Sequence, residues 1–173
     1  MRKEGIGLLR HNRGATVEEI APRDLGLAVG LPSLGTLRPK ARKHLGSAYE
    51  QFERSHWREG FEEACQSLEN LSRDYLVGEI VTGRVTQFIS NKFVKKASTA
   101  AVRKMTLGQL AYAFTQIPNQ NRTDAQLAQI LPKINKDRIG VAHHKHKSKT
   151  ETRLRKNVGM HMWSIIGGIK MLT

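Results

Sequence analysis

A long stripe of apolar residues between about Ser55 and Ile80 is the clearest periodic signal in the chain. Apolar side chains recur at intervals of three and four residues, at Trp57, Phe61, Ala64, Cys65, Leu68, Leu71, Tyr75 and Leu76. This spacing is typical of one face of an amphipathic α-helix. The opposite face is predicted to be solvated and acidic, with Glu59, Glu62, Glu63 and Glu69. Gly78 and Gly83 are suited to end the helix.

Three capping motifs mark predicted helix starts in the second half of the chain. In each, a hydroxyl residue precedes Gln or Glu by three positions: Thr106-Leu-Gly-Gln109, Thr123-Asp-Ala-Gln126 and Ser148-Lys-Thr-Glu151. The hydroxyl can accept a hydrogen bond from the third helical amide, while the Gln or Glu side chain returns to the cap amide. Pro118 and Asn119 should stop the first of these helices. The short spacing of the motifs predicts an all-α fold, an up-and-down bundle of four to five helices.

Two segments lack a clean period. Residues 84–104 alternate short β-rich runs with helix formers, and we interpret them as a helix or a broken helix. Residues 1–47 hold seven of the fifteen glycines and three of the five prolines, a composition that disfavours long helices. The sequence therefore predicts an irregular basic N-terminal arm, or the remnant of an upstream segment, over residues 1–47. The helical domain is expected over residues 48–173.

A helix-turn-helix that reads DNA is a further interpretation of the N-terminal segment, across residues 16–38. Pro22, Pro32 and Gly35 argue against it, because they interrupt the helices that such a motif needs.

Positive charge is concentrated in the last quarter of the chain. The 173 residues have a formal net charge of +14 at pH 7. Residues 133–173 carry 10 basic and 2 acidic side chains, whereas residues 48–132 carry 10 and 9. Such a distribution favours a polyanion partner, which includes RNA, DNA and anionic lipid, and places its surface late in the chain.

Cysteine usage and apolar runs indicate a cytoplasmic protein. Cys65 is the single cysteine, so no intrachain disulfide can form, and it is predicted to be an inert core thiol. The first residues show no apolar block of a secretion signal. The C-terminal run VGMHMWSIIGGIKMLT is too short to cross a bilayer and is expected to be a buried helix face, so no membrane partner is expected. Aromatics at helical spacing, namely Trp57, Tyr112, Phe114 and Trp163, are expected in the core more than in base stacking.

The stretch KDRIGVAHHKHKSKT, residues 136–150, carries the candidate chemistry and allows three interpretations. A metal site would use His143, His144 and His146, with His161 as an optional further ligand, but no second cysteine is available and the flanking lysines repel cations. A solvated basic turn would grip phosphates electrostatically. The third interpretation is RNA cleavage without metal, in which a neutral imidazole moves a proton and a guanidinium holds the charge that builds on the phosphorane.

The spacing of the two groups sets a geometric condition on the third interpretation. On a continuous helix, positions five apart point about 140° away from each other. Arg138 and His143 can therefore meet one phosphate only in two ways. Either the helix ends or distorts near residues 140–142, or the site is assembled across a symmetric dimer.

The pattern Arg138-Ile-Gly-Val-Ala-His143 resembles the hallmark of the HEPN domain (higher eukaryotes and prokaryotes nucleotide-binding), an arginine followed after four to six residues by a histidine late in a small helical bundle. The helices around FEEACQSLENLSRDYL and MTLGQL and the apolar final helix extend the resemblance over residues 48–173. It implies a metal-independent endoribonuclease acting as a face-to-face homodimer, commonly a toxin or an effector of defence against phage. Ile139 departs from the family, which usually has a polar residue there.

From this resemblance we expect no cofactor, a homodimer, and an antitoxin or regulatory protein as a further partner. Arg138 would stabilise the scissile phosphate and His143 would be the general acid/base, with His144 as its alternative and Asp137 orienting the arginine. The basic side chains expected to hold RNA are Lys136, Lys145, His146, Lys147, Lys149, Arg153, Arg155 and Lys156. The alternative function is a non-catalytic RNA-binding or scaffold module of a larger assembly.

Overall fold

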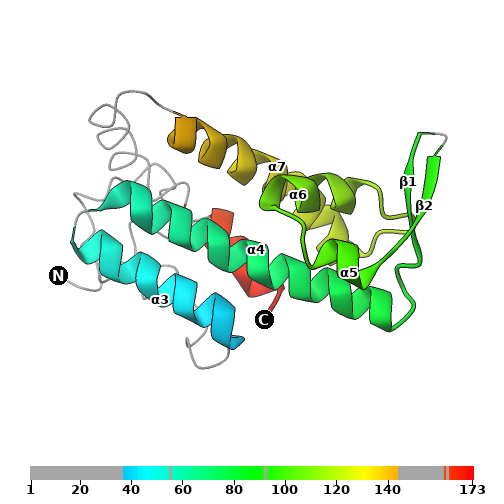
Figure 1. Cartoon of the computed structure of the whole chain (residues 1–173), viewed down its shortest axis with the longest axis horizontal. Helices are drawn as coiled ribbons and strands as arrows, with labels where there is room; N and C mark the ends of the chain where they lie inside the picture. Colours follow the sequence, from blue (N-terminus) through cyan, green and yellow to red (C-terminus); the bar gives the residue numbers. More distant parts are fainter. Residues whose placement is uncertain (1–36, 55, 92, 144–161, 163) are drawn as a thin grey trace.

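The computed structural model describes residues 37–54, 56–91, 93–143, 162 and 164–173. This part of the chain is mostly helical with one small two-stranded sheet, which confirms the mainly helical class. The described elements are α3 (Pro39–Glu53), α4 (Trp57–Val81), β1 (Gln87–Ser90), β2 (Phe93–Lys96), α5 (Thr99–Val102), α6 (Leu107–Thr115) and α7 (Arg122–His143) (Figure 1). None of the helices in these ranges is long and apolar enough to cross a membrane. The helix-turn-helix region up to residue 36 and the cap predicted at Ser148 lie outside the described residues.

Helices α3 and α4 pack side by side and run in opposite directions (Figure 1). The predicted stripe on α4 is buried except for Tyr75, which is partly buried, and α3 buries Ala41, Leu45, Ala48 and Phe52. Gly60 lets the two helices approach closely, since a Cβ there would lie 2.5 Å from the Phe52 ring. The boundary predicted between residues 47 and 48 falls inside α3, so regular structure begins earlier than the glycine and proline content indicated. Pro39 sits in the first turn of α3, where its missing N–H costs no helical hydrogen bond.

The helix or broken helix predicted over residues 84–104 is wrong where β1 and β2 form an antiparallel hairpin, and the described part of this segment is helical only at α5. Gly83, at a φ of 79°, directly follows Thr82, the C-cap residue of α4. Gly78 does not end the helix but lies inside it. Asn91, at a φ of 52°, starts the two-residue turn between Ser90 and its partner Phe93. A positive φ is tolerated better by Asn than by most residues, and hairpin turns of this length require it.

Helix α6 begins as predicted. Thr106 accepts a hydrogen bond from the Gln109 backbone, and the Gln109 side chain accepts from the Thr106 N–H at 2.9 Å. The helix ends at Thr115, before Pro118 and before Asn119, which has a φ of 56°.

The cap predicted for α7 at Thr123 is wrong by two residues. Asn121 Oδ1 accepts from the Asp124 N–H at 2.8 Å, and Asp124 Oδ2 accepts from the Asn121 N–H at 3.1 Å. Asn caps a helix better than Thr, and this pair is reciprocal. Asp124 is fully buried and also forms an ion pair with Arg84 at 2.8 Å and accepts from the Tyr75 hydroxyl at 3.1 Å. The α7 start is thereby tied to α4 and to the segment before the hairpin.

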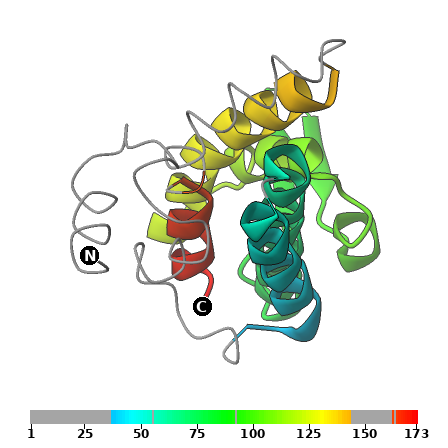
Figure 2. The same cartoon turned by 90° about the vertical axis from the view of Figure 1, so that its left-hand side faces the viewer.

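A C-terminal helical segment, residues 164–171, lies beneath α7 and beside α4 (Figure 2). Gly168 permits this contact, since a Cβ there would lie 2.8 Å from Leu68 and 3.2 Å from Ile130. Met162, Ile165, Ile166 and Ile169 are buried, which confirms the predicted buried face for the described part of this segment.

Candidate functional site

Arg138 projects from the inner side of α7. It follows the buried residues Leu131 and Ile134 by seven and four positions, so it shares their side of the helix. Its Nη1 donates a hydrogen bond to Glu69 Oε2 at 2.9 Å, and the arginine side chain is 31% exposed to solvent. The guanidinium is therefore held by a carboxylate of α4 at the edge of the core.

Glu69 is the centre of a buried network, and its predicted place on a solvated face is wrong. Its side chain is 6% exposed. Oε2 also accepts from the Leu107 N–H, the first amide of α6, at 2.8 Å, and Oε1 is paired with Arg73. Arg73 in turn donates to the Met105 carbonyl at 2.9 Å. One carboxylate thus connects α4, the start of α6 and α7, and the amide end of a helix favours negative charge.

The cavity beside Arg138 is acidic. It has a volume of about 530 Å³ and is lined by His44, Gln51, Glu59, Glu62, Glu63, Gln66 and Arg138. His44 Nδ1 lies 2.6 Å from Glu63 Oε2. Three carboxylates around one guanidinium repel phosphate, so this cavity is not suited to hold an RNA backbone.

Helix α7 continues without a break through residues 138–143, so the distortion that would align the pair is absent from this described helix. Positions 138 and 143 therefore diverge by about 140° around the helix axis. Asp137 is half-buried and Lys136 is exposed on the same helix. The side chain of His143 lies outside the described part of the chain. The same holds for the remaining predicted site residues, which are His144, Lys145, His146, Lys147, Lys149, Arg153, Arg155 and Lys156.

Cys65 is buried in α4, which confirms the prediction of a core thiol. Burial raises the pKa of this thiol well above its ordinary value, while the charge of Arg138 acts in the opposite direction. A protonated buried thiol is a poor nucleophile and metal ligand. No three side chains among His, Cys, Asp and Glu converge as a metal site within the ranges that the structure describes.

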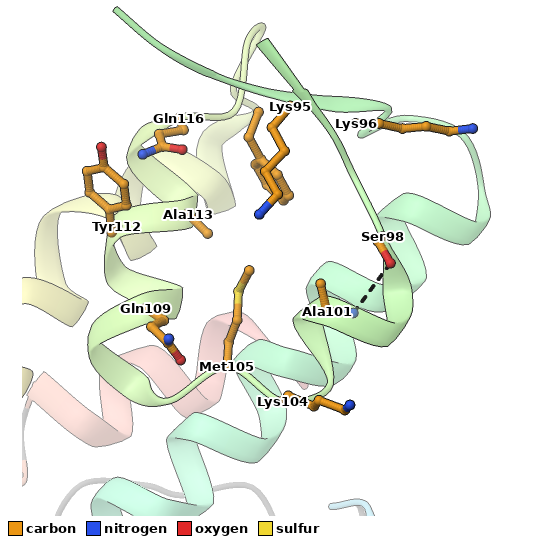
Figure 3. Close-up of a pocket in the computed structure, with 11 residues that line it drawn as sticks. Lys95, Lys96, Ser98, Ala101, Lys104, Met105, Gln109, Tyr112, Ala113 and Gln116 are labelled. Atoms are coloured by element: carbon orange, nitrogen blue, oxygen red, sulfur yellow. Dashed lines mark hydrogen bonds between the residues drawn. The ribbon is translucent and has the colours of Figure 1, made fainter. Parts of the chain in front are cut away.

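Two surface features were missed by the sequence analysis. A groove between α6 and α7 is lined by Gly108, Ala111, Tyr112, Thr115, Pro132, Asn135, Lys136 and Ile139. Tyr112 and Ile139 are 62% and 49% exposed there, so the prediction that Tyr112 belongs to the core is wrong, whereas Trp57 and Phe114 are buried as predicted. A second cavity lies between the hairpin and α6 (Figure 3). Apolar periodicity gave no signal for either, because both depend on how elements meet.

No protein-family model, curated protein or solved structure matches the chain.

Proposed function

We propose that this protein is a metal-independent endoribonuclease of the HEPN type, built as an up-and-down helical bundle and active as a homodimer in the cytoplasm. The observation that carries the proposal is the position of Arg138 and His143 at the C-terminal end of the long helix α7, inside a mainly helical domain. The +14 charge of the chain supports RNA as the partner. By the resemblance of the Arg138–His143 pattern to the HEPN hallmark, its role is that of a toxin or an effector of defence against phage, controlled by an antitoxin or regulatory protein.

The continuous helix requires a composite site. Since one chain directs positions 138 and 143 to different sides of α7, a productive pair combines Arg138 of one protomer with His143 of the other. The groove between α6 and α7 supports this assembly. Its exposed Ile139 lies between the two positions in sequence, and an apolar side chain there favours contact with a second copy over contact with water.

The reaction needs only the RNA and these two side chains. His143 takes the proton of the ribose 2′-hydroxyl, and the 2′-oxygen attacks the adjacent phosphorus. Arg138 stabilises the negative charge on the phosphorane, and the bond to the 5′-oxygen then breaks, with that oxygen receiving the proton from the imidazolium of His143. The products are a 2′,3′-cyclic phosphate and a 5′-hydroxyl.

Glu69 positions Arg138 in this scheme. The hydrogen bond at Nη1 uses one donor of a guanidinium that has five N–H groups, and the exposed fraction of the side chain leaves donors for a phosphate. Because Glu69 is itself anchored by the Leu107 amide, the arginine is held in one orientation before RNA binds.

The same contact favours a second candidate function, a non-catalytic RNA-binding or scaffold module. A guanidinium that is already neutralised by Glu69 and faces an acidic cavity is a weaker phosphate ligand than a free one. In this function Arg138 only holds α7 to α4, and the basic surfaces bind RNA without cleavage.

A cleavage assay separates the two functions. Labelled single-stranded RNA is incubated with the protein in excess chelator, and the products are examined for a 2′,3′-cyclic phosphate. Arg138→Ala and His143→Ala should each lower the rate by about 10²–10⁴-fold. Arg122→Ala, at the opposite end of α7, is the control and should cleave as the wild type does. Intact RNA with the wild-type protein, bound but not cleaved, would establish the second function instead.

Mixing the two inactive variants tests the composite site. If Arg138 and His143 act from different protomers, half of the dimers in an equal mixture are heterodimers with one intact site of two. The mixture should therefore recover about a quarter of the wild-type rate. A site built within one chain leaves every site defective, and no recovery would contradict the composite arrangement.

A further inference from the structure

The cavity between the hairpin and α6 is a built pocket of about 390 Å³, within the size range of small-ligand sites. Two contacts hold the hairpin over α6. The Ile89 N–H donates to the Gln116 carbonyl at 2.8 Å, and the Ser90 and Tyr112 hydroxyls lie 2.8 Å apart. Helix α5 and the segment up to Met105 close the other side (Figure 3).

The walls of this pocket combine apolar surface with one charged group that points inward. Phe88, Met105 and Ala113 supply the apolar surface. Lys95 and Lys96 both line the pocket. The Lys95 ammonium group points into it, whereas the Lys96 ammonium group points away from it (Figure 3).

Exposed aromatic residues flank the entrance. In the hairpin register Phe88 pairs with Lys95 and Ser90 pairs with Phe93, so these four side chains share one face of the sheet. Phe93 is 80% exposed at the tip of that face, and Ser90 contacts the exposed Tyr112. The apolar cavity is therefore lined by one inward ammonium group and by the solvent-facing ring of Tyr112, and the exposed Phe93 ring lies on the same face of the hairpin as Lys95.

We propose that this pocket binds one nucleotide unit of single-stranded RNA. The base enters between Met105 and Phe88, its phosphate pairs with Lys95, and a neighbouring base stacks on Phe93. The proposal rests on the proposed function for RNA as the ligand and adds a site for the substrate away from α7. Tyr112 lines both this pocket and the α6–α7 groove, so bound RNA would lie at the edge of the dimer.

Binding of a single-stranded oligonucleotide with 2′-O-methyl riboses tests the pocket, because this RNA has no 2′-hydroxyl nucleophile and cannot be cleaved by the proposed reaction. Fluorescence anisotropy gives the affinity at several salt concentrations in excess chelator. Lys95→Gln should weaken binding by about tenfold and flatten the log–log salt slope by about 0.7. Phe93→Ala should also weaken binding by about tenfold.

Lys96→Gln is the matched control, since it removes the same charge from the adjacent residue on the other face of the hairpin. It should change the affinity by less than about threefold. Thermal melting of the three variants should show that each remains folded. Phe93, Lys95 and Lys96 are all exposed, so we expect their replacement to change the stability of the fold little. An equal loss for Lys95→Gln and Lys96→Gln would mean diffuse electrostatic binding and would overturn the pocket.

Competition identifies the source of the nucleotide. Single-stranded RNA should compete in a Lys95-dependent way, and duplex RNA should not, because its bases are stacked and paired. A nucleoside monophosphate that competes as well as the oligonucleotide supports the same pocket with a free nucleotide as its ligand. Binding of an acidic peptide that depends on Lys95 and excludes RNA would overturn the proposal.

The outcomes for the two proposals are independent. Lys95-dependent binding without any cleavage supports the pocket and refutes the nuclease. Cleavage that requires Arg138 and His143, together with identical binding by Lys95→Gln and Lys96→Gln, supports the nuclease and refutes the pocket.

Discussion

At the scale of single residues, buried acids decide more of the structure than the sequence pattern indicates. Glu69 follows the buried Leu68 and lies at the border of the apolar stripe of α4, where residue type alone predicts solvent. Its burial is possible because an amide of α6 and two arginines surround it. Asp124 is buried for the same reason, through Arg84, Tyr75 and its own helix cap.

Glu69→Gln should lower the free energy of unfolding by about 3 kcal/mol, because it leaves two arginines without their carboxylate at the edge of the core. Chemical denaturation followed by circular dichroism measures the change. Glu59→Gln is the matched control in the same helix, and its exposed side chain should change stability by less than about 0.5 kcal/mol. Equal stability of the two variants would contradict the role of Glu69 as the connection between α4, α6 and α7.

At the scale of elements, the hairpin explains where sequence reasoning failed. Residues 84–104 contain Val, Ile and Phe beside Lys and Ala, so local preference does not separate strand from helix. The turn at Asn91 and the hydrogen bond from Ile89 to Gln116 fix the strand form. A two-stranded sheet is marginal alone, and its attachment to α6 supplies the missing stability.

The contact between α3 and α4 can be tested with two glycines of α4. A Cβ at Gly60 would lie 2.5 Å from the Phe52 ring, whereas a Cβ at Gly78 would have nothing within 4 Å. Gly60→Ala should therefore destabilise the protein by about 1–3 kcal/mol through overpacking. Gly78→Ala should stabilise it by about 0.5–1 kcal/mol, because alanine loses less backbone freedom in a helix.

Thermal or chemical unfolding of both variants provides the comparison. If Gly60→Ala were as stable as Gly78→Ala, the close approach of α3 to α4 at Phe52 would be refuted.

At the scale of the whole molecule, the proposed dimer places the α6–α7 groove against a second copy. Ile139→Asp should weaken self-association by at least about tenfold, since it places a charge in an apolar contact. Analytical ultracentrifugation over a range of protein concentrations measures the association. The same variant should lose RNA cleavage in proportion to the loss of dimer.

Val81→Asp is the control for this experiment. Val81 is also an exposed apolar residue, but it lies at the end of α4 and outside the groove. It should leave the association unchanged. A wild-type chain that is monomeric at every concentration, or a dimer that tolerates Ile139→Asp, would count against the α6–α7 interface.

The sequence by itself determined the helices whose signals are local. The stripe of α4, the cap of α6 and the burial of Cys65 all follow from spacing and side-chain type, because a helix repeats every 3.6 residues wherever it lies. The Arg138–His143 spacing was also readable, including the divergence that a straight helix imposes on it.

Only the tertiary structure decided which partners these elements bring to one another. Glu69 meets Arg138 across 69 positions of the chain, and the pocket beside Lys95 exists only where the hairpin lies over α6. Periodicity specifies which side of an element is apolar, but not which distant element covers it. The free energy of a buried polar group depends on that distant partner, so the acidic surroundings of Arg138 and the basic pocket at the hairpin appear only after the chain is packed.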